Sequence, residues 1–412
     1  MKCRHCNSVL SQTFVDLGFA PPSNAYLSKE DLLKPEKYYP LKVKVCEECW
    51  LVQTEDYANA DELFSSEYAY FSSTSTSWLR HAEKYSKKII SRLNLNKDSH
   101  VIEVASNDGY LLKNFKEANI PCLGIEPTES TARAAEANGI NVVKKFFGEA
   151  LGKELARNGK QADLIIGNNV YAHVPDINDF TKGLKAALKP TGTITLEFPH
   201  LLRLIEGVQF DTIYHEHFSY LSLYSVNRIF VSCGLRIWNV EELGTHGGSI
   251  RVYGCHEDDS RETLPSVGSI LLKEEAFGLR KIETYKNFQL KAEKIKNDLL
   301  TFLIGQRVKG KKVVAYGAAA KGNTLLNFAG IKPDLLPVVF DAAESKQGKF
   351  LPGSHIPILC PNQIEKQGID AVLILPWNIA NEIKDKVFNN LGANSKAIDF
   401  ILGISPKNYL YK

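Results

Sequence analysis

The sequence predicts an α/β protein in which a cysteine-rich N-terminal module precedes two doubly wound, Rossmann-like units. Two Cys-x-x-Cys pairs occur in the first part of the chain. Strand-sized apolar runs then alternate with helical periodicity, and the same alternation starts again near residue 312 after a long amphipathic stretch. Such alternation is typical of parallel sheets with helices on both faces. At 412 residues, the chain is long enough for two or three domains.

The cysteine pairs predict a metal site. Two Cys-x-x-Cys pairs supply four thiolates for one tetrahedral Zn²⁺, although the 39 residues between the pairs exceed the usual ribbon spacing. Because four thiolates leave no coordination position open, we expect the zinc to be structural. Residues 1–65 are predicted to form this zinc-binding module, with short strands at 13–17 and 41–45. The expected ligands are Cys3, Cys6, Cys46 and Cys49.

Residues 66–270 are predicted to form the larger doubly wound unit. Buried parallel strands read as continuous apolar runs, and helices as apolar positions three or four residues apart. The expected elements are a helix at 78–93, a strand at 101–104, a helix at 109–118, a strand at 122–125, a helix at 130–138, a strand at 164–166, a helix at 179–189 and a strand at 193–197.

The last third of the chain is predicted to hold a connecting helix and the smaller unit. Apolar residues recur at steps of three or four over 271–303, which predicts one long helix between domains. This spacing is not sustained long enough for a coiled coil. Residues 304–412 then read as a second Rossmann-like domain. Its expected elements are strands at 312–316, 338–341 and 371–375, with a Gly-rich turn at 317–323 that opens a helix.

Composition excludes some partners. The 50 basic and 47 acidic side chains nearly cancel, giving a net charge of +3 without a long basic stripe, so we expect no nucleic acid partner. The longest apolar runs are strand-sized, and no signal peptide is visible. We therefore expect a cytoplasmic protein without a membrane partner. The sequence leaves the oligomeric state open, and we favour a monomer.

The loop after the first strand of the larger unit favours S-adenosylmethionine (SAM) as ligand. It departs from the Gly-x-Gly-x-x-Gly pattern because Ala105 and Asn107 replace the first two glycines. A dinucleotide needs close backbone approach to its pyrophosphate, which SAM lacks. Glu126, at the end of the next strand, is expected to hold the ribose hydroxyls. An ordinary crossover with a small-residue turn is the alternative. The expected cofactor-binding residues are Glu103, Ala105, Ser106, Asn107, Gly109, Glu126 and Asn168.

A dense group of proton-transfer side chains occupies residues 214–220, where two imidazoles, a carboxylate and two phenols occur together. A methyltransferase that acts on oxygen or nitrogen often needs no base, whereas one that methylates carbon must first remove a proton. The alternatives are a zinc cluster or polar residues at a strand end, but His-Glu-His lacks the i, i+4 spacing of a helical zinc site. His173, after the third strand, is either a second active-site imidazole or a core or capping histidine.

Two Gly-containing segments are expected near the substrate. The first, at 245–251, reads as a hairpin that carries His246 and Arg251, the latter as a phosphate or carboxylate contact. The second places small residues and a lysine at a helix N-terminus, which is an anion site. A nucleotide diphosphate would fit there, and a capped crossover with solvated lysines is the alternative. The expected contacts in the second segment and beyond it are Gly317, Lys321, Asn323 and Asp341.

As a set, these motifs resemble the nucleotide-sugar C-3′-methyltransferases of deoxysugar biosynthesis, and the resemblance spans nearly the whole chain. It implies SAM-dependent methylation at C3 of a dTDP-linked 4-keto-deoxysugar, with structural zinc and a C-terminal domain that helps to hold the nucleotide. It also implies that His217 is the base. The other active-site groups implied are Tyr214, Glu216, His173 and Tyr68, with Tyr70 as the rival of Tyr68. The alternatives are a sugar O- or N-methyltransferase, or a non-catalytic protein that binds a nucleotide sugar.

Overall fold

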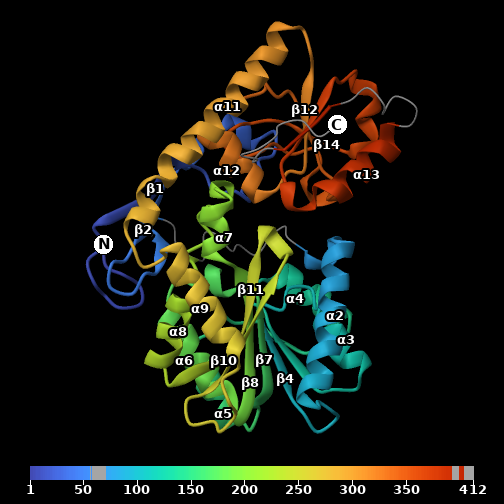
Figure 1. Ribbon diagram of the computed structural model, residues 1–412. Coiled ribbons are helices and arrows are strands. Elements are labelled where there is room, and N and C mark those ends of the chain that lie inside the picture. Colours follow the sequence, from blue (N-terminus) through green and yellow to red (C-terminus); the bar gives the residue numbers. More distant parts are fainter. Residues whose placement is uncertain (56, 58–70, 392–398, 403–412) are drawn as a thin grey trace.

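The computed structural model describes residues 1–55, 57, 71–391 and 399–402 (Figure 1). Tyr68 and Tyr70 lie outside these described residues, so their predicted roles stay predictions. Three sheets organise the fold, in agreement with the predicted α/β class. In Figure 1 the N-terminal module (blue) lies to one side, the larger unit lies below, and the C-terminal unit (orange to red) lies above.

The N-terminal module is an antiparallel sheet that a distant segment completes. Its strands are β1 (Gln12–Ala20), β2 (Tyr39–Val45), β3 (Val52–Thr54) and β9 (Ser219–Tyr220), in that order. The first two contain the predicted strands at 13–17 and 41–45. The last comes from the larger unit, where Val52 pairs with Tyr220 and Gln53 pairs with Ser219. The N-terminal sheet therefore extends into the centre of the molecule.

The larger unit is built on a seven-stranded sheet. Strand order is β10 (Leu235–Leu243), β11 (Ser249–His256), β8 (Leu188–Pro199), β7 (Ala162–Asn168), β4 (Val101–Val104), β5 (Cys122–Ile125) and β6 (Val142–Val143). Within this sheet, β11 alone runs antiparallel to its two neighbours. The predicted doubly wound order is therefore confirmed, and the hairpin predicted at 245–251 connects β10 to β11.

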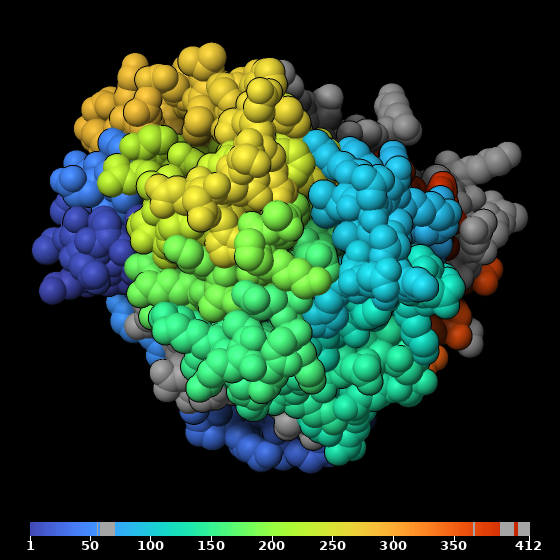
Figure 2. Space-filling model, turned by 90° about the horizontal axis from the view of Figure 1, so that it is seen from below, coloured from blue at the N-terminus to red at the C-terminus, as the bar shows by residue number. Residues whose placement is uncertain are grey.

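Helices cover both faces of this sheet. One face packs against α2 (Thr76–Leu93), α3 (Leu112–Glu117) and α4 (Glu129–Ala137). The other packs against α5 (Glu149–Arg157), α6 (Ile177–Ala187) and α8 (Leu223–Ser232). A short helix, α7 (Leu201–Glu206), follows β8 and packs in the core shared with the N-terminal module. Seen from below, these helices fill the centre of the surface, with the N-terminal module at its edge (Figure 2).

The single helix predicted over 271–303 is wrong. The chain forms three helices there, α9 (Pro265–Phe277), α10 (Glu283–Lys286) and α11 (Phe288–Val308). Gly278 ends α9 in the left-handed conformation (φ 91°) and donates its N–H to the carbonyls of Glu274 and Glu275. The apolar periodicity continues across this break because both flanking helices bury one face. In Figure 1, α11 runs diagonally from the N-terminal module to the C-terminal unit.

The C-terminal unit is the predicted second, smaller doubly wound domain. Its sheet is parallel throughout, in the order β14 (Ile358–Leu359), β13 (Val339–Phe340), β12 (Val313–Tyr316), β15 (Ala371–Ile374) and β16 (Asp399–Leu402). Alternate residues of β12 face opposite cores, one shared with α11 and α12 (Ala320–Ala329) and the other with α13 (Ala380–Leu391). Within the described residues, no helix is long and apolar enough to cross a membrane.

Candidate active site

The four predicted zinc ligands come together. Their sulfur atoms all lie within 4.8 Å of one another, with Sγ–Sγ distances of 3.5 Å for Cys3 and Cys49 and for Cys6 and Cys46. A tetrahedral zinc with Zn–S bonds of about 2.3 Å needs sulfur–sulfur edges of about 3.8 Å, so the group fits the metal. The Gln53 side-chain amide donates to Cys3 Sγ at 3.2 Å. The four sulfurs link the start of the chain to the turn between β2 and β3, which is a structural role.

The predicted cofactor loop folds around Glu126. One carboxylate oxygen accepts the backbone N–H of Asn107 and the other that of Thr128, each at 2.9 Å. These bonds tie the end of β5 to the loop after β4. Ala105 and Asn107 adopt positive φ values of 56° and 50°, as a tight loop requires. Gly109 (φ 76°) has no room for a side chain, because a Cβ atom would lie 3.1 Å from Ile140.

Buried polar atoms without partners mark the carboxyl ends of β4 and β7. Within the described residues, no hydrogen bond reaches Glu103 Oε2, Ser106 Oγ, Asp108 Oδ1 or either polar atom of the Asn168 amide. Burial, followed by the charges of Asp108 and Glu126, raises the pKa of Glu103 well above its usual value. Unpaired buried polar atoms are costly and need an explanation. A polar ligand at the strand ends, where doubly wound sheets bind ligands, supplies one. These atoms fit SAM.

His217 has a defined tautomer. Its Nδ1 lies 2.8 Å from the carbonyl oxygen of Thr212, and because a carbonyl only accepts, Nδ1 carries the proton. The lone pair is therefore on Nε2. Burial, followed by the neighbouring His173, lowers the pKa of His217 well below 6.5, so the ring is neutral at pH 7. A buried neutral imidazole with a free lone pair is suited to act as a general base.

The other predicted catalytic side chains surround this ring. The ring centroid of Tyr214 lies 3.9 Å from that of His217, and the centroid of His173 lies 4.6 Å away. Burial lowers the pKa of His173 to about 4, partly offset by a hydrogen bond between its ring and the Glu216 backbone. Both imidazoles are therefore uncharged at neutral pH. The contiguous motif and the distant His173 thus form one cluster.

Glu216 is held by the N-terminal module. The Asn24 side-chain amide donates to Glu216 Oε1 at 3.1 Å, whereas Oε2 has no hydrogen bond within the described residues. Burial raises the pKa of Glu216 to about 7, and the Asn24 hydrogen bond opposes this shift. Thr54 donates its hydroxyl to the carbonyl of His217 at 3.2 Å and its N–H to that of Phe218 at 3.1 Å. Sequence reasoning missed Asn24 and Thr54, since no local pattern connects them to residues 214–218.

The residues predicted to contact the substrate through the C-terminal unit have internal partners. Asp341 accepts the backbone N–H groups of Ala318 and Ala343 at 2.6 and 2.8 Å, and the Asn323 amide donates to the Ser23 carbonyl at 2.6 Å. Gly317 (φ 92°) packs where a Cβ atom would meet the Pro376 ring at 2.4 Å. These contacts account for Asp341 and Gly317 without a ligand, whereas Asn323 Oδ1 has no hydrogen bond within the described residues. Their part in substrate binding stays a prediction.

Lys321 faces the catalytic cluster. It lies in the first turn of α12, since the helix begins at Ala320, and its ammonium donates to Asn378 Oδ1 at 2.7 Å. Burial lowers the pKa of Lys321, and its positive charge is among the groups that lower the pKa of His217 and His246. The ammonium lies over the Trp377 ring, 4.9 Å from its centroid. A partly buried cation whose charge acts on two neutral imidazoles suits an anionic ligand.

His246 and Arg251 differ in their surroundings. His246 (φ 52°) lies at the tip of the hairpin, with Nε2 3.2 Å from the Asn169 amide nitrogen and its ring 5.4 Å from that of Trp78. Arg251 instead forms a short ion pair with Glu197, both fully buried. Its charge is thus already neutralised by the protein. A substrate contact through Arg251 stays a prediction that this pairing disfavours.

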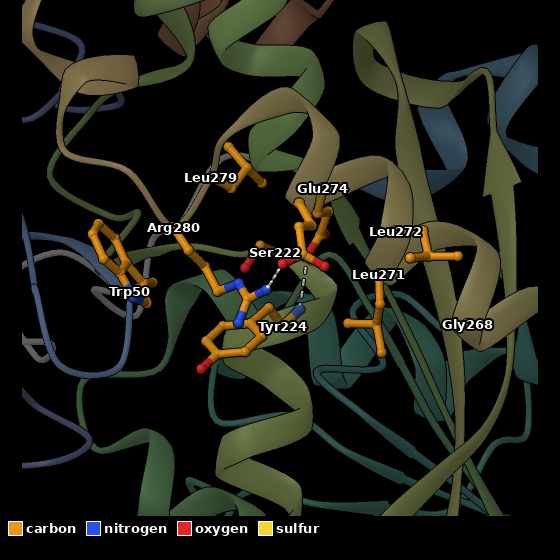
Figure 3. Close-up of a pocket in the computed structure, with 10 residues that line it drawn as sticks. Trp50, Ser222, Tyr224, Gly268, Leu271, Leu272, Glu274, Leu279 and Arg280 are labelled. Carbon is orange, nitrogen blue, oxygen red and sulfur yellow. Dashed lines mark hydrogen bonds and ion pairs between the residues drawn. The ribbon is translucent and has the colours of Figure 1, made fainter.

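A separate pocket of about 360 Å³ lies away from this cluster (Figure 3). None of the predicted site residues lines it. Trp50 and Tyr224 face it from two sides, and the Arg280 guanidinium lies 4.9 Å from the Tyr224 ring centroid. The Glu274 carboxylate in its wall is fully used, because it accepts from His200 and from the first two N–H groups of α8. The Glu274 carboxylate is therefore not available to a ligand in this pocket.

Comparison with known proteins covers all three units. Family models match a zinc binding domain at residues 3–64, a methyltransferase domain at 78–240 and a C-methyltransferase C-terminal domain at 244–401. C-methyltransferase NovU of Streptomyces niveus is 35% identical over 384 residues, which is 93% of this chain and 91% of that protein. The predicted domain limits are not tested by these matches and stay predictions.

Solved structures resemble a smaller part of the chain. Magnesium protoporphyrin IX methyltransferase from Synechocystis PCC 6803, solved with bound SAH, is 15% identical with a TM-score of 0.34 and covers 43% of this chain and 82% of its own. An S-adenosylmethionine-dependent methyltransferase from Clostridium acetobutylicum is 11% identical with a TM-score of 0.35, covering 43% and 92%.

The strand order of the seven-stranded sheet, the polar loop at its strand ends and the matched methyltransferase domain define a SAM-dependent methyltransferase. Four clustered cysteines in the matched zinc binding domain identify zinc as its structural metal. The chain belongs to the C-methyltransferase family that includes NovU, and it transfers methyl groups to carbon. The predicted enzyme class and cofactors are confirmed.

Proposed function

We propose that the protein methylates C3 of a nucleotide-linked 4-keto-deoxysugar, with dTDP as the expected nucleotide. The single observation that supports this best is the tautomer of His217, which leaves Nε2 as a proton acceptor in a buried site. Carbon at C3 is not a nucleophile until its proton is removed, and a C4 ketone makes that proton acidic. A carbon methyltransferase of such a sugar therefore needs a base of this kind.

Proton removal is the step that the protein's own residues perform. His217 Nε2 takes the C3 proton and the C–H electron pair forms the enolate, whose negative charge is on the C4 oxygen. The resulting imidazolium is stabilised by the hydrogen bond from Nδ1 to the Thr212 carbonyl. The ring must be neutral beforehand, and its lowered pKa ensures this at physiological pH.

Positioning of the sugar and stabilisation of the enolate are assigned to the neighbouring polar groups. Glu216 has a pKa of about 7 and one oxygen without a partner in the described residues, so its ionised form is able to accept a hydrogen bond from a sugar hydroxyl. Tyr214 and His173 lie against the base and hold its ring. Loss of one well-placed donor to an oxyanion typically costs about 3 kcal/mol. When bound, SAM supplies the electrophilic methyl group that the carbon attacks.

The nucleotide diphosphate is assigned to the interface between the larger unit and the C-terminal unit. Lys321 supports this assignment, because it is a partly buried cation whose charge lowers the pKa of His217 and of His246. Asp211 lies behind it and accepts the Trp377 indole N–H at 2.7 Å. In a nucleotide sugar the diphosphate lies a short distance from the sugar. A positive charge beside the reacting sugar is therefore close to the diphosphate.

Incubation with SAM and a panel of 4-keto nucleotide sugars tests the proposal. We expect one added methyl group by mass, with its NMR signal coupled through carbon at C3. Substrate deuterated at C3 should lose its label to solvent. A methyl group on oxygen or nitrogen would instead identify a heteroatom methyltransferase. Tight binding without methylation of any sugar would favour the non-catalytic alternative.

A further inference from the structure

A loop of the N-terminal module lies between the catalytic segment and the C-terminal unit. It directly follows β1, and the C-terminal unit holds it at three points. The Ser23 carbonyl accepts the Asn323 amide at 2.6 Å, and the Tyr26 hydroxyl donates to the Ala318 carbonyl at 2.6 Å. Leu27 exchanges two backbone hydrogen bonds with Phe350, at 3.0 and 2.8 Å. The position of this loop is therefore fixed.

Asn24 is the residue of this loop that reaches the catalytic cluster. Its side-chain amide nitrogen, which can only donate, contacts Glu216 Oε1. We propose that Asn24 is a positioning residue of the methyl-transfer site, holding one oxygen of Glu216 so that the other meets the substrate. This inference rests on the proposed function, in which Glu216 bonds the sugar. It assigns the zinc-bearing module a part in catalysis that needs no chemistry at the metal.

The surroundings of Glu216 make this single hydrogen bond important. The side chain is 1% exposed, so water cannot replace a lost partner. Within the described residues, the titratable groups near it are the phenols of Tyr26 and Tyr220 and the ring of His173, which bonds its backbone. Burial keeps both phenols protonated and His173 uncharged at neutral pH. The amide of Asn24 thus favours the ionised form of the carboxylate and orients it.

A mechanical path connects this contact to the zinc group. β1 leads into the loop and pairs with β2, whose last residue, Val45, immediately precedes Cys46. The four sulfurs hold that end of β2 against the start of the chain. Movement of β2 would displace β1 and the loop that carries Asn24.

The test compares Asn24→Ala with the control Asn178→Ala. Asn178 also joins the N-terminal module to the larger unit, donating its amide to the backbone of Arg4 and His5, but it does not touch Glu216. Loss of the Asn24 donor favours the protonated carboxyl, so the acid limb of the kcat pH profile should move upward by about one pH unit. Turnover at pH 7 should fall about fivefold or more, because a pKa one unit higher lowers the ionised fraction of Glu216 from about one half to about one eleventh, and SAH affinity should be unchanged. The control should keep the wild-type profile.

A second readout is independent of turnover. In protein with ¹³C-labelled glutamate carboxyl groups, the Glu216 signal is the one lost in Glu216→Gln, and it should titrate near pH 7. In Asn24→Ala it should titrate about one unit higher. Asn24→Leu, which has nearly the same shape but neither donor nor charge, covers a failure of the alanine variant to fold and should behave alike.

The two readouts separate the possible failures. Unchanged titration and an unchanged pH profile in both Asn24 variants would overturn the inference. A shifted Glu216 signal together with a wild-type pH profile would overturn it as well, because the contact would then have no part in the reaction. If the wild-type protein methylated no 4-keto sugar while the signal shifted, the proposed function would fail and the contact between the two side chains would stand.

Discussion

Replacement of His217 by asparagine separates the role of its two ring nitrogens. The amide nitrogen of asparagine occupies nearly the place of Nδ1, so it is able to keep the hydrogen bond to the Thr212 carbonyl. Nothing in the shorter side chain reaches the place of Nε2. Because the site is buried, water does not readily take over that position. The variant therefore removes the proton acceptor and little else.

The expected loss follows from the contribution of a positioned base. General-base catalysis is typically worth 10²- to 10⁴-fold in rate, or about 3–5 kcal/mol of transition-state energy. We expect the rate loss of His217→Asn to lie at the upper end of that range, because His173 is not placed to replace the base. The two ring centroids are 4.6 Å apart, but the His173 ring bonds the Glu216 backbone. SAH and nucleotide-sugar affinities should change little, because the substitution removes the proton acceptor and not a contact that contributes to ground-state binding.

Single-turnover methyl transfer and C3 deuterium washout measure this loss together. The matched control is His215→Asn, two residues earlier, whose ring Nε2 contacts the Tyr39 carbonyl at 3.3 Å outside the catalytic cluster. The control should retain turnover and washout. Turnover of His217→Asn within tenfold of wild type would refute the reasoning, and His173 would then be the next candidate for the base.

Three further predictions concern stability, metal and cofactor. Arg251→Met should cost about 3–5 kcal/mol in urea unfolding at pH 7, because it leaves the buried Glu197 carboxylate without its guanidinium partner. Burial alone would raise the pKa of Glu197, but the hydrogen bond from His81 and the charge of Arg251 hold it at about 2. The stabilisation is therefore complete above pH 4.5 and is lost as the pH falls toward 2, so an equal deficit at pH 3 would contradict this account. Cys49→Ser should lower the zinc content from about one per chain and lower the Tm, and an unchanged metal content would contradict the four-sulfur site. Glu126→Gln should weaken SAH binding in calorimetry by about tenfold or more, and unchanged affinity would exclude it as a ribose contact.

The sequence predicted those parts of the fold that local patterns encode. The strands at 101–104 and 122–125 have the predicted limits, since buried parallel strands are continuous apolar runs. The helix over 271–303 was wrong because periodicity reports a buried face and not helix continuity across Gly278. Short helices such as α5 and α8 were missed, although both pack on the sheet.

The same limit applies to the site. Tyr214, Glu216 and His217 were predictable because they are contiguous, and their clustering is visible without a structure. Asn24 and Thr54 were not, because they reach the cluster only through long-range packing and the pairing of β3 with β9. Their residue types are ordinary for turns and strands. Only the folded chain shows that they hold catalytic groups.

The shared N-terminal sheet also constrains the order in which the protein is able to fold. β1, β2 and β3 leave the ribosome well before β9, so β3 has an unpaired edge during that interval. Zinc binding to the four N-terminal cysteines stabilises the partial sheet before β9 is synthesised. When residues 217–220 arrive, they close that edge and bring the catalytic imidazole into place in one event. Pairing of β3 with β9 thus completes the first sheet and places the segment that carries His217.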